Sequence, residues 1–223
     1  MRNLMFILAL LSAGALPTPA FAVGHRCSAT ACFLAPDGVP PSTGESAQAR
    51  RATLLFFSDA HAELEEHPEM FLSHGQAEVV PAGGYARMAA AVQAIRKETG
   101  GRTLLFDGGD TFQGSAAAAW SKGEAMVAPQ RALGIDVGIP GNWEVIYGAD
   151  QLRKLIGALN YPMLATNVLD ARTGKPLLRL SIEREVGGVR LGIVGFTDPD
   201  VPDRQPPGYS QGLRYLGSES IAP

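Results

Sequence analysis

Leu54-Leu55-Phe56-Phe57-Ser58-Asp59-Ala60-His61 is an apolar run of strand length that ends in a carboxylate and an imidazole. The same pattern, an apolar run followed by polar side chains, recurs at residues 104–111 and 135–144. Short apolar runs predict buried strands, and side chains just beyond the carboxyl ends of such strands gather at one edge of a sheet. The polar residues expected to lie together at this edge are Asp59, His61, Asp110 and Asn142.

Two helices are expected between and after these strands. Apolar residues recur at spacings of three and four between Gly83-Gly84 and Gly100-Gly101, which is typical of an amphipathic helix. The same spacing recurs over residues 152–159. Residues 62–82 carry charged side chains without an apolar period, so they are expected to form a long polar connection.

Further strands are expected nearer the C-terminus. Residues 163–168 form a fourth apolar run, and residues 178–183 and 189–193 alternate apolar with polar side chains on either side of Gly187-Gly188. Alternation around a Gly-Gly pair predicts an antiparallel hairpin. Because strands and helices alternate along the chain, we expect an α/β fold.

The N-terminus has the features of a secretory signal peptide. Arg2 provides the positive charge, residues 4–15 the apolar core, and Ala20-Phe21-Ala22 the small-x-small cleavage site. The apolar core is interrupted and short for a bilayer span, so residues 1–22 are expected to be removed and no stable membrane anchor to remain. These features predict a secreted or periplasmic protein.

The signal peptide is followed by a leader and one domain. Residues 23–51 carry Pro, Gly and Ser without an apolar period and are expected to be flexible. Cys27 and Cys32 lie in this leader. In an oxidising compartment a local disulfide between them is the leading interpretation, with a metal-binding pair as the alternative. Residues 52–223 have the length of a single domain.

Composition and charge limit the partners of the chain. Hydrophobic residues make up 46% and charged residues 18% of the 223 residues, which fits a globular protein. The formal net charge is −3, and it becomes −4 when Arg2 is lost with the signal peptide. A nucleic-acid polymer is not expected as a partner, because binding to the phosphate backbone depends on clustered Lys and Arg.

The polar residues after the first two strands have the chemistry of metal ligands. Asp59 and His61 are two residues apart, so in an extended chain their side chains share a face and can bind one ion. Asp110 follows Gly108-Gly109, where the backbone can approach a ligand closely, and it is a better candidate than Asp107. Taken separately, the Asp-x-His pair and the Gly-rich turn are also compatible with ordinary loops.

The third polar segment is Gly141-Asn142-Trp143-Glu144. Asn142 offers a neutral amide oxygen as a ligand, and Glu144 is placed to accept a hydrogen bond that supports the ligands. By itself the segment is almost uninformative. Its value lies in its place after the third expected strand.

The order of these motifs is similar to that in the secreted 5′-nucleotidase branch of the calcineurin-like metallophosphoesterases. The likeness covers roughly residues 52–216. Its motifs are at residues 58–61, 83–87, 107–115, 122–124, 133–136, 141–144, 147–148, 165–168 and 194–197. The resemblance implies a layered α/β sandwich with mixed sheets and flanking helices, and a hydrolase of phosphate monoesters, in particular nucleotides.

The same resemblance implies two divalent metal ions, drawn from Mn, Zn, Fe and Mg. The implied ligands are Asp59 and His61 on the first ion, Asp110 as the bridge, and Asn142 on the second. Glu144 is expected to support the ligands, and Asn167 to contact the substrate.

Trp143 departs from the family pattern. It stands where the family has a histidine that protonates the leaving group, and an indole does not titrate. Tryptophan at this place is similar to the periplasmic thiosulfohydrolases of bacterial sulfur oxidation, so a hydrolase of sulfur compounds is the alternative function. That branch has a histidine where this chain has Asn142.

The ligand set is also smaller than the family's. Family members carry further histidine ligands downstream, whereas no histidine follows His74 here. The matching positions leave one ion with three protein ligands and the other with two. We therefore expect residues 52–223 to be the N-terminal part of a metallophosphoesterase domain, C-terminally incomplete, with a non-catalytic binding domain as the third interpretation.

Overall fold

The computed structural model describes residues 25–28, 31–34, 50–206, 208–217 and 219 of the chain. The signal peptide expected at residues 1–22 lies outside the described residues. Among the residues that are described, no helix combines the length and the apolar character that crossing a membrane requires.

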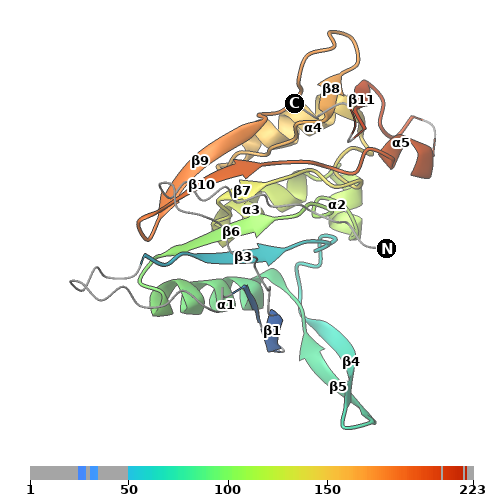
Figure 1. Cartoon of the computed structure of the whole chain (residues 1–223). Coiled ribbons are helices and arrows are strands. Elements are labelled where there is room, and N and C mark those ends of the chain that lie inside the picture. The colour runs from blue at the N-terminus through green and yellow to red at the C-terminus, as the bar shows by residue number, and fades with distance from the viewer. Residues whose placement is uncertain (1–24, 29–30, 35–49, 207, 218, 220–223) are drawn as a thin grey trace, which may run out of the picture.

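A parallel sheet of three strands lies at the centre of the fold and confirms the strands expected from the three apolar runs. The first of them is not buried as expected, because it lies at the edge of the sheet, where Phe56 is 51% exposed. β3 (Thr53–Phe57), β6 (Thr103–Asp107) and β7 (Val137–Gly138) lie in the order β3-β6-β7. Leu55 pairs with Leu105, and every residue of the central strand β6 is buried. β3 and β6 point the same way (Figure 1), so the polar loops that follow them meet at one edge of the sheet.

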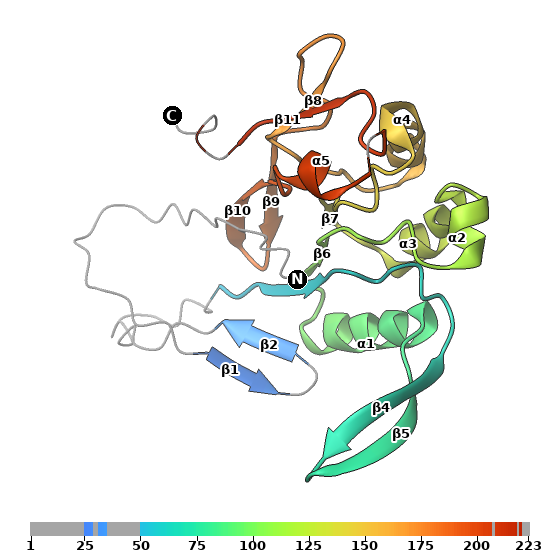
Figure 2. The ribbon, with the colours of Figure 1, turned by 90° about the vertical axis from the view of Figure 1, so that its right-hand side faces the viewer.

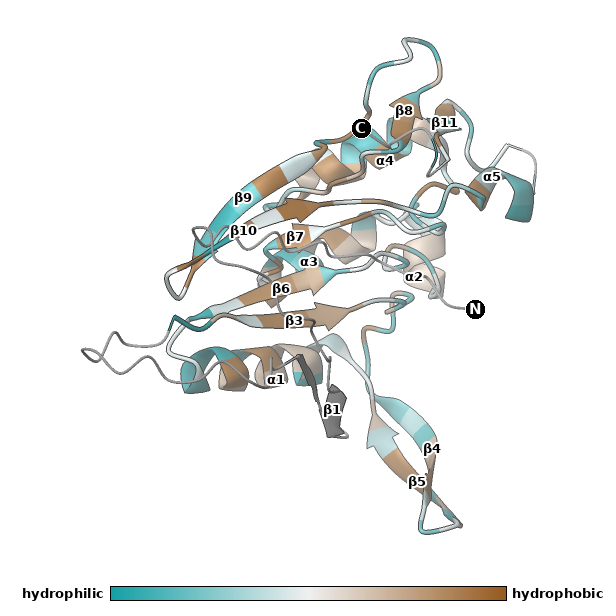
Figure 3. Cartoon of the chain, in the orientation of Figure 1, coloured by the Kyte–Doolittle hydropathy of each residue, from teal (hydrophilic) through white to brown (hydrophobic). Residues whose placement is uncertain are grey.

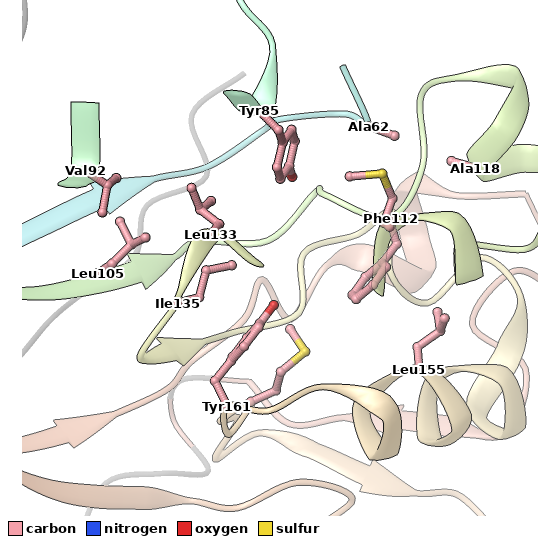
Figure 4. Packing of buried hydrophobic residues seen from close by; sticks show 12 residues of the cluster. Ala62, Tyr85, Val92, Leu105, Phe112, Ala118, Leu133, Ile135, Leu155 and Tyr161 are labelled. Atoms are coloured by element: carbon pink, nitrogen blue, oxygen red, sulfur yellow. The ribbon is translucent and has the colours of Figure 1, made fainter. Parts of the chain in front are cut away.

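Helices cover one face of this sheet. α1 (Tyr85–Glu98) is the helix expected between the first two strands, and α3 (Val127–Leu133) lies beside it. Figure 4 shows Leu105 of β6 next to Val92 of α1, with Leu133 of α3 nearby. These side chains belong to the larger of the apolar clusters that form the core.

An antiparallel hairpin covers the other face, as the alternating sequence predicts. It consists of β9 (Ser181–Val186) and β10 (Val189–Val194), and its first strand begins three residues later than expected. Gly187 and Gly188 form the turn with φ of 58° and 76°, and a two-residue turn of this kind requires positive φ at both positions. The apolar side chains between hairpin and sheet include Leu104, Phe106, Val137, Ile139, Ile182, Leu191 and Ile193. The result is the expected layered α/β sandwich.

The prediction that residues 62–82 form an irregular connection is wrong. They contain a hairpin of β4 (His67–Ser73) and β5 (Gln76–Ala82), which projects from the body of the molecule (Figures 1 and 3). His74 and Gly75 make its turn with φ of 51° and 80°. Neither face of this hairpin is buried, so its sequence lacks the alternation by which strands are recognised.

Residues 163–168 do not form the single continuous strand that was expected of a fourth apolar run. Met163 makes one isolated parallel bridge, to Gly138 in β7, and β8 (Val168–Asp170) pairs instead with β11 (Leu213–Tyr215). Because β7 is only two residues long, it offers little edge to a longer partner. The apolar run therefore contributes two isolated bridges, of which the second joins Leu164 to Arg179, and the first residue of a strand in another sheet.

The remaining elements are short, except for α4 (Gly148–Ala158), which confirms the second expected helix. The others are α2 (Ala116–Trp120), a 3-10 helix at Glu124–Met126 and α5 (Val201–Arg204). They connect the strands around the sheet edge.

A small hairpin occurs within the segment for which the sequence predicts a flexible leader. It consists of β1 (His25–Ser28) and β2 (Ala31–Leu34), which lie side by side in Figure 2. The backbone register sets Cys27 opposite Cys32. The disulfide between them stays a prediction.

Candidate metal centre

The loops after β3 and β6 run side by side and are joined by backbone hydrogen bonds. The N–H of Asp59 donates to the carbonyl of Gly109 at 2.9 Å, and the N–H of His61 donates to the carbonyl of Asp110 at 2.9 Å. These bonds continue the pairing of the two strands beyond the sheet. They bring the residues that were expected to be metal ligands to the same edge.

Asp59, His61 and Asp110 form a group in which one donor atom from each side chain lies within 4.8 Å of the others. Nε2 of His61 is 3.8 Å from Oδ1 of Asp59. Two ligands that each bind one ion at about 2.1 Å are at most about 4.2 Å apart, so this pair fits a single ion. Asp110 is 2% exposed whereas Asp59 is exposed, so the group has a solvent-facing side. Its oxygen and nitrogen donors suit Mn, Zn, Fe or Mg.

All three residues have left-handed backbone conformations. The φ angles are 57° at Asp59, 43° at His61 and 58° at Asp110. This region costs free energy for residues other than glycine, although Asp and His tolerate it better than most. Such conformations concentrate at functional sites, where the surrounding structure imposes them. The backbone of this group is therefore held by its neighbours.

Glu144 provides much of this support. The side chain is 1% exposed and accepts hydrogen bonds from four backbone N–H groups. The donors are Asp110, Thr111, Phe112 and Gly141, at 2.7, 2.6, 3.0 and 2.7 Å. Burial and then the charge of Asp110 raise the pKa of Glu144, while the backbone N–H groups oppose that rise. One carboxylate thus ties the loop after β6 to the loop after β7.

The same two loops approach each other closely at a pair of glycines. A Cβ atom added to Gly109 would lie 2.2 Å from the nitrogen of Gly141, and one added to Gly141 would lie 2.2 Å from Oδ1 of Asp110. Gly109 also has a φ of 88°. Side chains at these positions would force the loops apart, so the glycines are required by the geometry of the group.

Asn142 lies beside the group in the loop after β7. The N–H groups on either side of it, those of Gly141 and Trp143, donate to Glu144 and to Oδ1 of Asp110 at 2.7 and 2.9 Å. The backbone at Asn142 is therefore fixed at the same edge of the sheet as the other three expected ligands. Its role as a ligand stays a prediction.

Asn167, for which the sequence predicts substrate contact, is completely buried. Its Nδ2 donates to the carbonyl of Thr197 at 2.7 Å, and its Oδ1 accepts from the N–H of Thr197 at 3.1 Å. The hydroxyl of Thr197 in turn donates to the carbonyl of Pro140 at 2.6 Å. The contacts that the structure shows for Asn167 brace the loop after β7 from within the protein.

Asp107 is a buried carboxylate behind the group, and the sequence pattern ranks it below Asp110 as a ligand. Its Oδ1 accepts from the N–H of Gly109 and from the hydroxyl of Thr111, both at 2.9 Å, and the Tyr161 hydroxyl lies 3.4 Å from Oδ2. Burial, followed by the charge of Glu144, raises the pKa of Asp107 to about 7. A carboxylate as the last residue of an otherwise apolar strand is the sequence signal that points to it.

The raised pKa of Asp107 predicts a dependence of stability on pH. Because the folded chain keeps a proton that the unfolded chain releases above about pH 4, this residue makes the free energy of unfolding fall as pH rises from about 4 to about 7. Asp107→Asn is expected to reduce that fall and to stabilise the metal-free protein by about 1–3 kcal/mol at pH 8. Urea unfolding in the presence of a chelator, repeated at several pH values, measures both effects. If the free energy of unfolding of Asp107→Asn fell with pH as steeply as that of the wild type, or of the exposed control Asp203→Asn, the prediction would be contradicted.

Comparisons with known proteins identify relatives of the chain. No family model matches the chain. The chain is 32% identical over 168 residues to the 5′-nucleotidase of Mus musculus, which covers 73% of the chain and 29% of the relative. The 5′-nucleotidase precursor of Thermus thermophilus has a TM-score of 0.64 at 28% identity, over 76% of the chain and 32% of that structure. The chain spans less than a third of the length of these two relatives.

A sulfur-compound hydrolase shares the architecture. The sulfate thiohydrolase SoxB of Thermus thermophilus has a TM-score of 0.66 at 24% identity, over 82% of the chain and 41% of that structure, which shows a common fold. The sequence identity to the 5′-nucleotidase of Mus musculus and the structural similarity to the Thermus thermophilus precursor indicate the same relationship. The chain is therefore homologous to the 5′-nucleotidases and has the fold of the calcineurin-like metallophosphoesterases.

Proposed function

We propose that the protein takes part in the metal-dependent hydrolysis of phosphate monoesters, with nucleotides as substrates. The observation that carries this proposal is the group of Asp59, His61 and Asp110, whose donor atoms lie within 4.8 Å of one another at the edge of the parallel sheet. The homology to 5′-nucleotidases supports the substrate class.

The proposed metal site holds two divalent ions. The residues that would hold them are Asp59, His61, Asp110 and Asn142. When bound, divalent ions neutralise the charge of phosphoryl oxygens and activate water as a nucleophile. The protein's own part is to fix the ligands: Glu144 holds the Asp110 loop through four backbone N–H groups.

Metal dependence of phosphate release tests the proposal. The purified protein is stripped with a chelator and reloaded with Mn²⁺ or Zn²⁺. We expect inorganic phosphate to be released from AMP by the reloaded protein, and release to return to background when the chelator is added again, because the ions carry the charge that binds the phosphoryl group. Release that is unaffected by the chelator, or no release from any nucleotide with metal bound, would contradict it.

A second candidate function is hydrolysis of a thiosulfonate to release sulfate, and Trp143 favours it. An indole at the edge of the group cannot supply a proton to a nucleotide's leaving group. Sulfate release from a thiosulfonate, measured beside phosphate release from AMP with the same metal-loaded protein, separates the two. If the protein bound metal stoichiometrically but released neither phosphate nor sulfate, the result would support a non-catalytic binding role.

We propose that the protein acts outside the cytoplasm, in the periplasm or after secretion. The signal-peptide pattern of residues 1–22 supports this location. Fractionation of cells that express the protein with and without these residues tests it: export of the form that lacks them would contradict the proposal.

A further inference from the structure

Trp143 lies directly against one of the proposed ligands. Its ring centre is 5.6 Å from that of His61, and the planes of the two rings meet at 84° in an edge-to-face arrangement. The indole is 36% exposed, so part of its surface faces solvent and part faces the imidazole. Aromatic pairs prefer such edge-to-face geometry over direct face-to-face stacking.

A second contact holds His61 from another side. Its Nδ1 is 3.2 Å from the carbonyl oxygen of Gln113, and a carbonyl oxygen can only accept a hydrogen bond. Nδ1 therefore carries a proton and donates it, which leaves the lone pair on Nε2, the atom 3.8 Å from Asp59. This is the tautomer that a histidine needs in order to bind a metal through Nε2.

The backbone of Trp143 contacts a second proposed ligand. Its N–H donates to Oδ1 of Asp110 at 2.9 Å. The segment is further held by the side chain of Gln205, which donates to the carbonyl of Asn142, and by the bond from Gly141 to Glu144. The position of the indole is thus set by a backbone that is itself fixed.

We propose that Trp143 is a positioning residue: its indole fixes the ring of His61 while its N–H fixes the carboxylate of Asp110. The proposal rests on the proposed metal-dependent function and goes beyond it. It assigns a use to the tryptophan at the position where a proton donor was expected. Since the N–H remains in any substitution except proline, the indole contact is the part that mutation can test.

Metal affinity and the tautomer of His61 provide the measurements. We expect Trp143→Ala to weaken Mn²⁺ binding about tenfold in calorimetry, and Trp143→Phe to weaken it about twofold, because phenylalanine keeps an aromatic edge. Nitrogen-15 spectra of the metal-free protein should show His61 as the Nδ1–H tautomer in the wild type and in Trp143→Phe, and as a mixture in Trp143→Ala. Urea unfolding verifies that each variant is folded.

Trp120 provides the matched control. It is the other of the two tryptophans of the chain, is 86% exposed and lies at the end of α2. Trp120→Ala should leave both measurements unchanged. In Trp120→Phe the remaining indole is Trp143, and Co²⁺ should quench its fluorescence as the site fills.

The outcomes of these measurements distinguish the positioning role of Trp143 from the proposed hydrolysis. Equal Mn²⁺ affinity and an unchanged tautomer in Trp143→Ala would overturn the positioning role, even if the protein released phosphate. If Trp143→Ala changed the tautomer of His61 and the Mn²⁺ affinity but the wild type released no phosphate, the positioning role would be supported. The proposed hydrolysis would be contradicted.

Discussion

Asp110→Asn is expected to lower the metal-dependent kcat/KM for phosphate release by about a thousandfold or more. It is also expected to weaken Mn²⁺ binding by more than about 100-fold, which exceeds the effect of changing a residue that only supports a ligand. The amide is neutral and cannot supply the negative charge of the proposed carboxylate ligand. Its Oδ1 can still accept the N–H of Trp143, so the loop is expected to keep its conformation. Calorimetric titration with Mn²⁺ and phosphate release from AMP measure the two effects.

Asp203→Asn is the matched control for this substitution. Asp203 is exposed in α5, and the same change of charge there should leave metal affinity and phosphate release within about twofold of the wild type. If Asp110→Asn bound Mn²⁺ as tightly as this control, Asp110 would not be a ligand.

Glu144→Gln is expected to have the largest effect on folding. Each carboxylate oxygen of Glu144 accepts two backbone N–H groups, and whichever way the glutamine amide is oriented, its NH₂ faces two donors. Buried donors left without acceptors are costly, so the free energy of unfolding should fall by about 3–5 kcal/mol. Urea denaturation followed by circular dichroism measures it. Metal affinity should fall too, because the loop carrying Asp110 is released.

Glu183→Gln tests whether this loss is specific. Glu183 is exposed on β9, and its amidation should change the free energy of unfolding by less than about 0.5 kcal/mol. A stability loss no larger in Glu144→Gln than in Glu183→Gln would show that the carboxylate does not hold the two loops together.

The elements that could be predicted are those with a strong local pattern. β3 and β6 are apolar runs, α1 has helical spacing between glycines, and the turn of the β9–β10 hairpin is marked by Gly187 and Gly188. In β6 and α1 the pattern arises because one or both faces of the element are buried. The β4–β5 hairpin was missed because its faces are exposed, so burial left no pattern in its sequence.

The candidate site shows the same division. Asp59, His61 and Asp110 were predicted to lie together because each follows a strand of a parallel sheet, and the structure brings their donor atoms together. Their role as metal ligands is a prediction that the metal-binding experiments test. The contact of Asp107 with Tyr161 was not predictable, because the two residues are 54 positions apart in the sequence.

By itself the sequence determined the order of the strands that end in polar loops, the helix between the first two of them and the family likeness of the motifs, because these properties are local or follow from their order along the chain. Only the tertiary structure decided how those loops are held. The hydrogen bonds from Asp110, Thr111 and Phe112 to Glu144, the edge-to-face contact of Trp143 with His61 and the close approach of Gly109 to Gly141 join residues that are about 30 to 80 positions apart. Such contacts depend on distances in space, and the spacing of residues along a chain does not specify them.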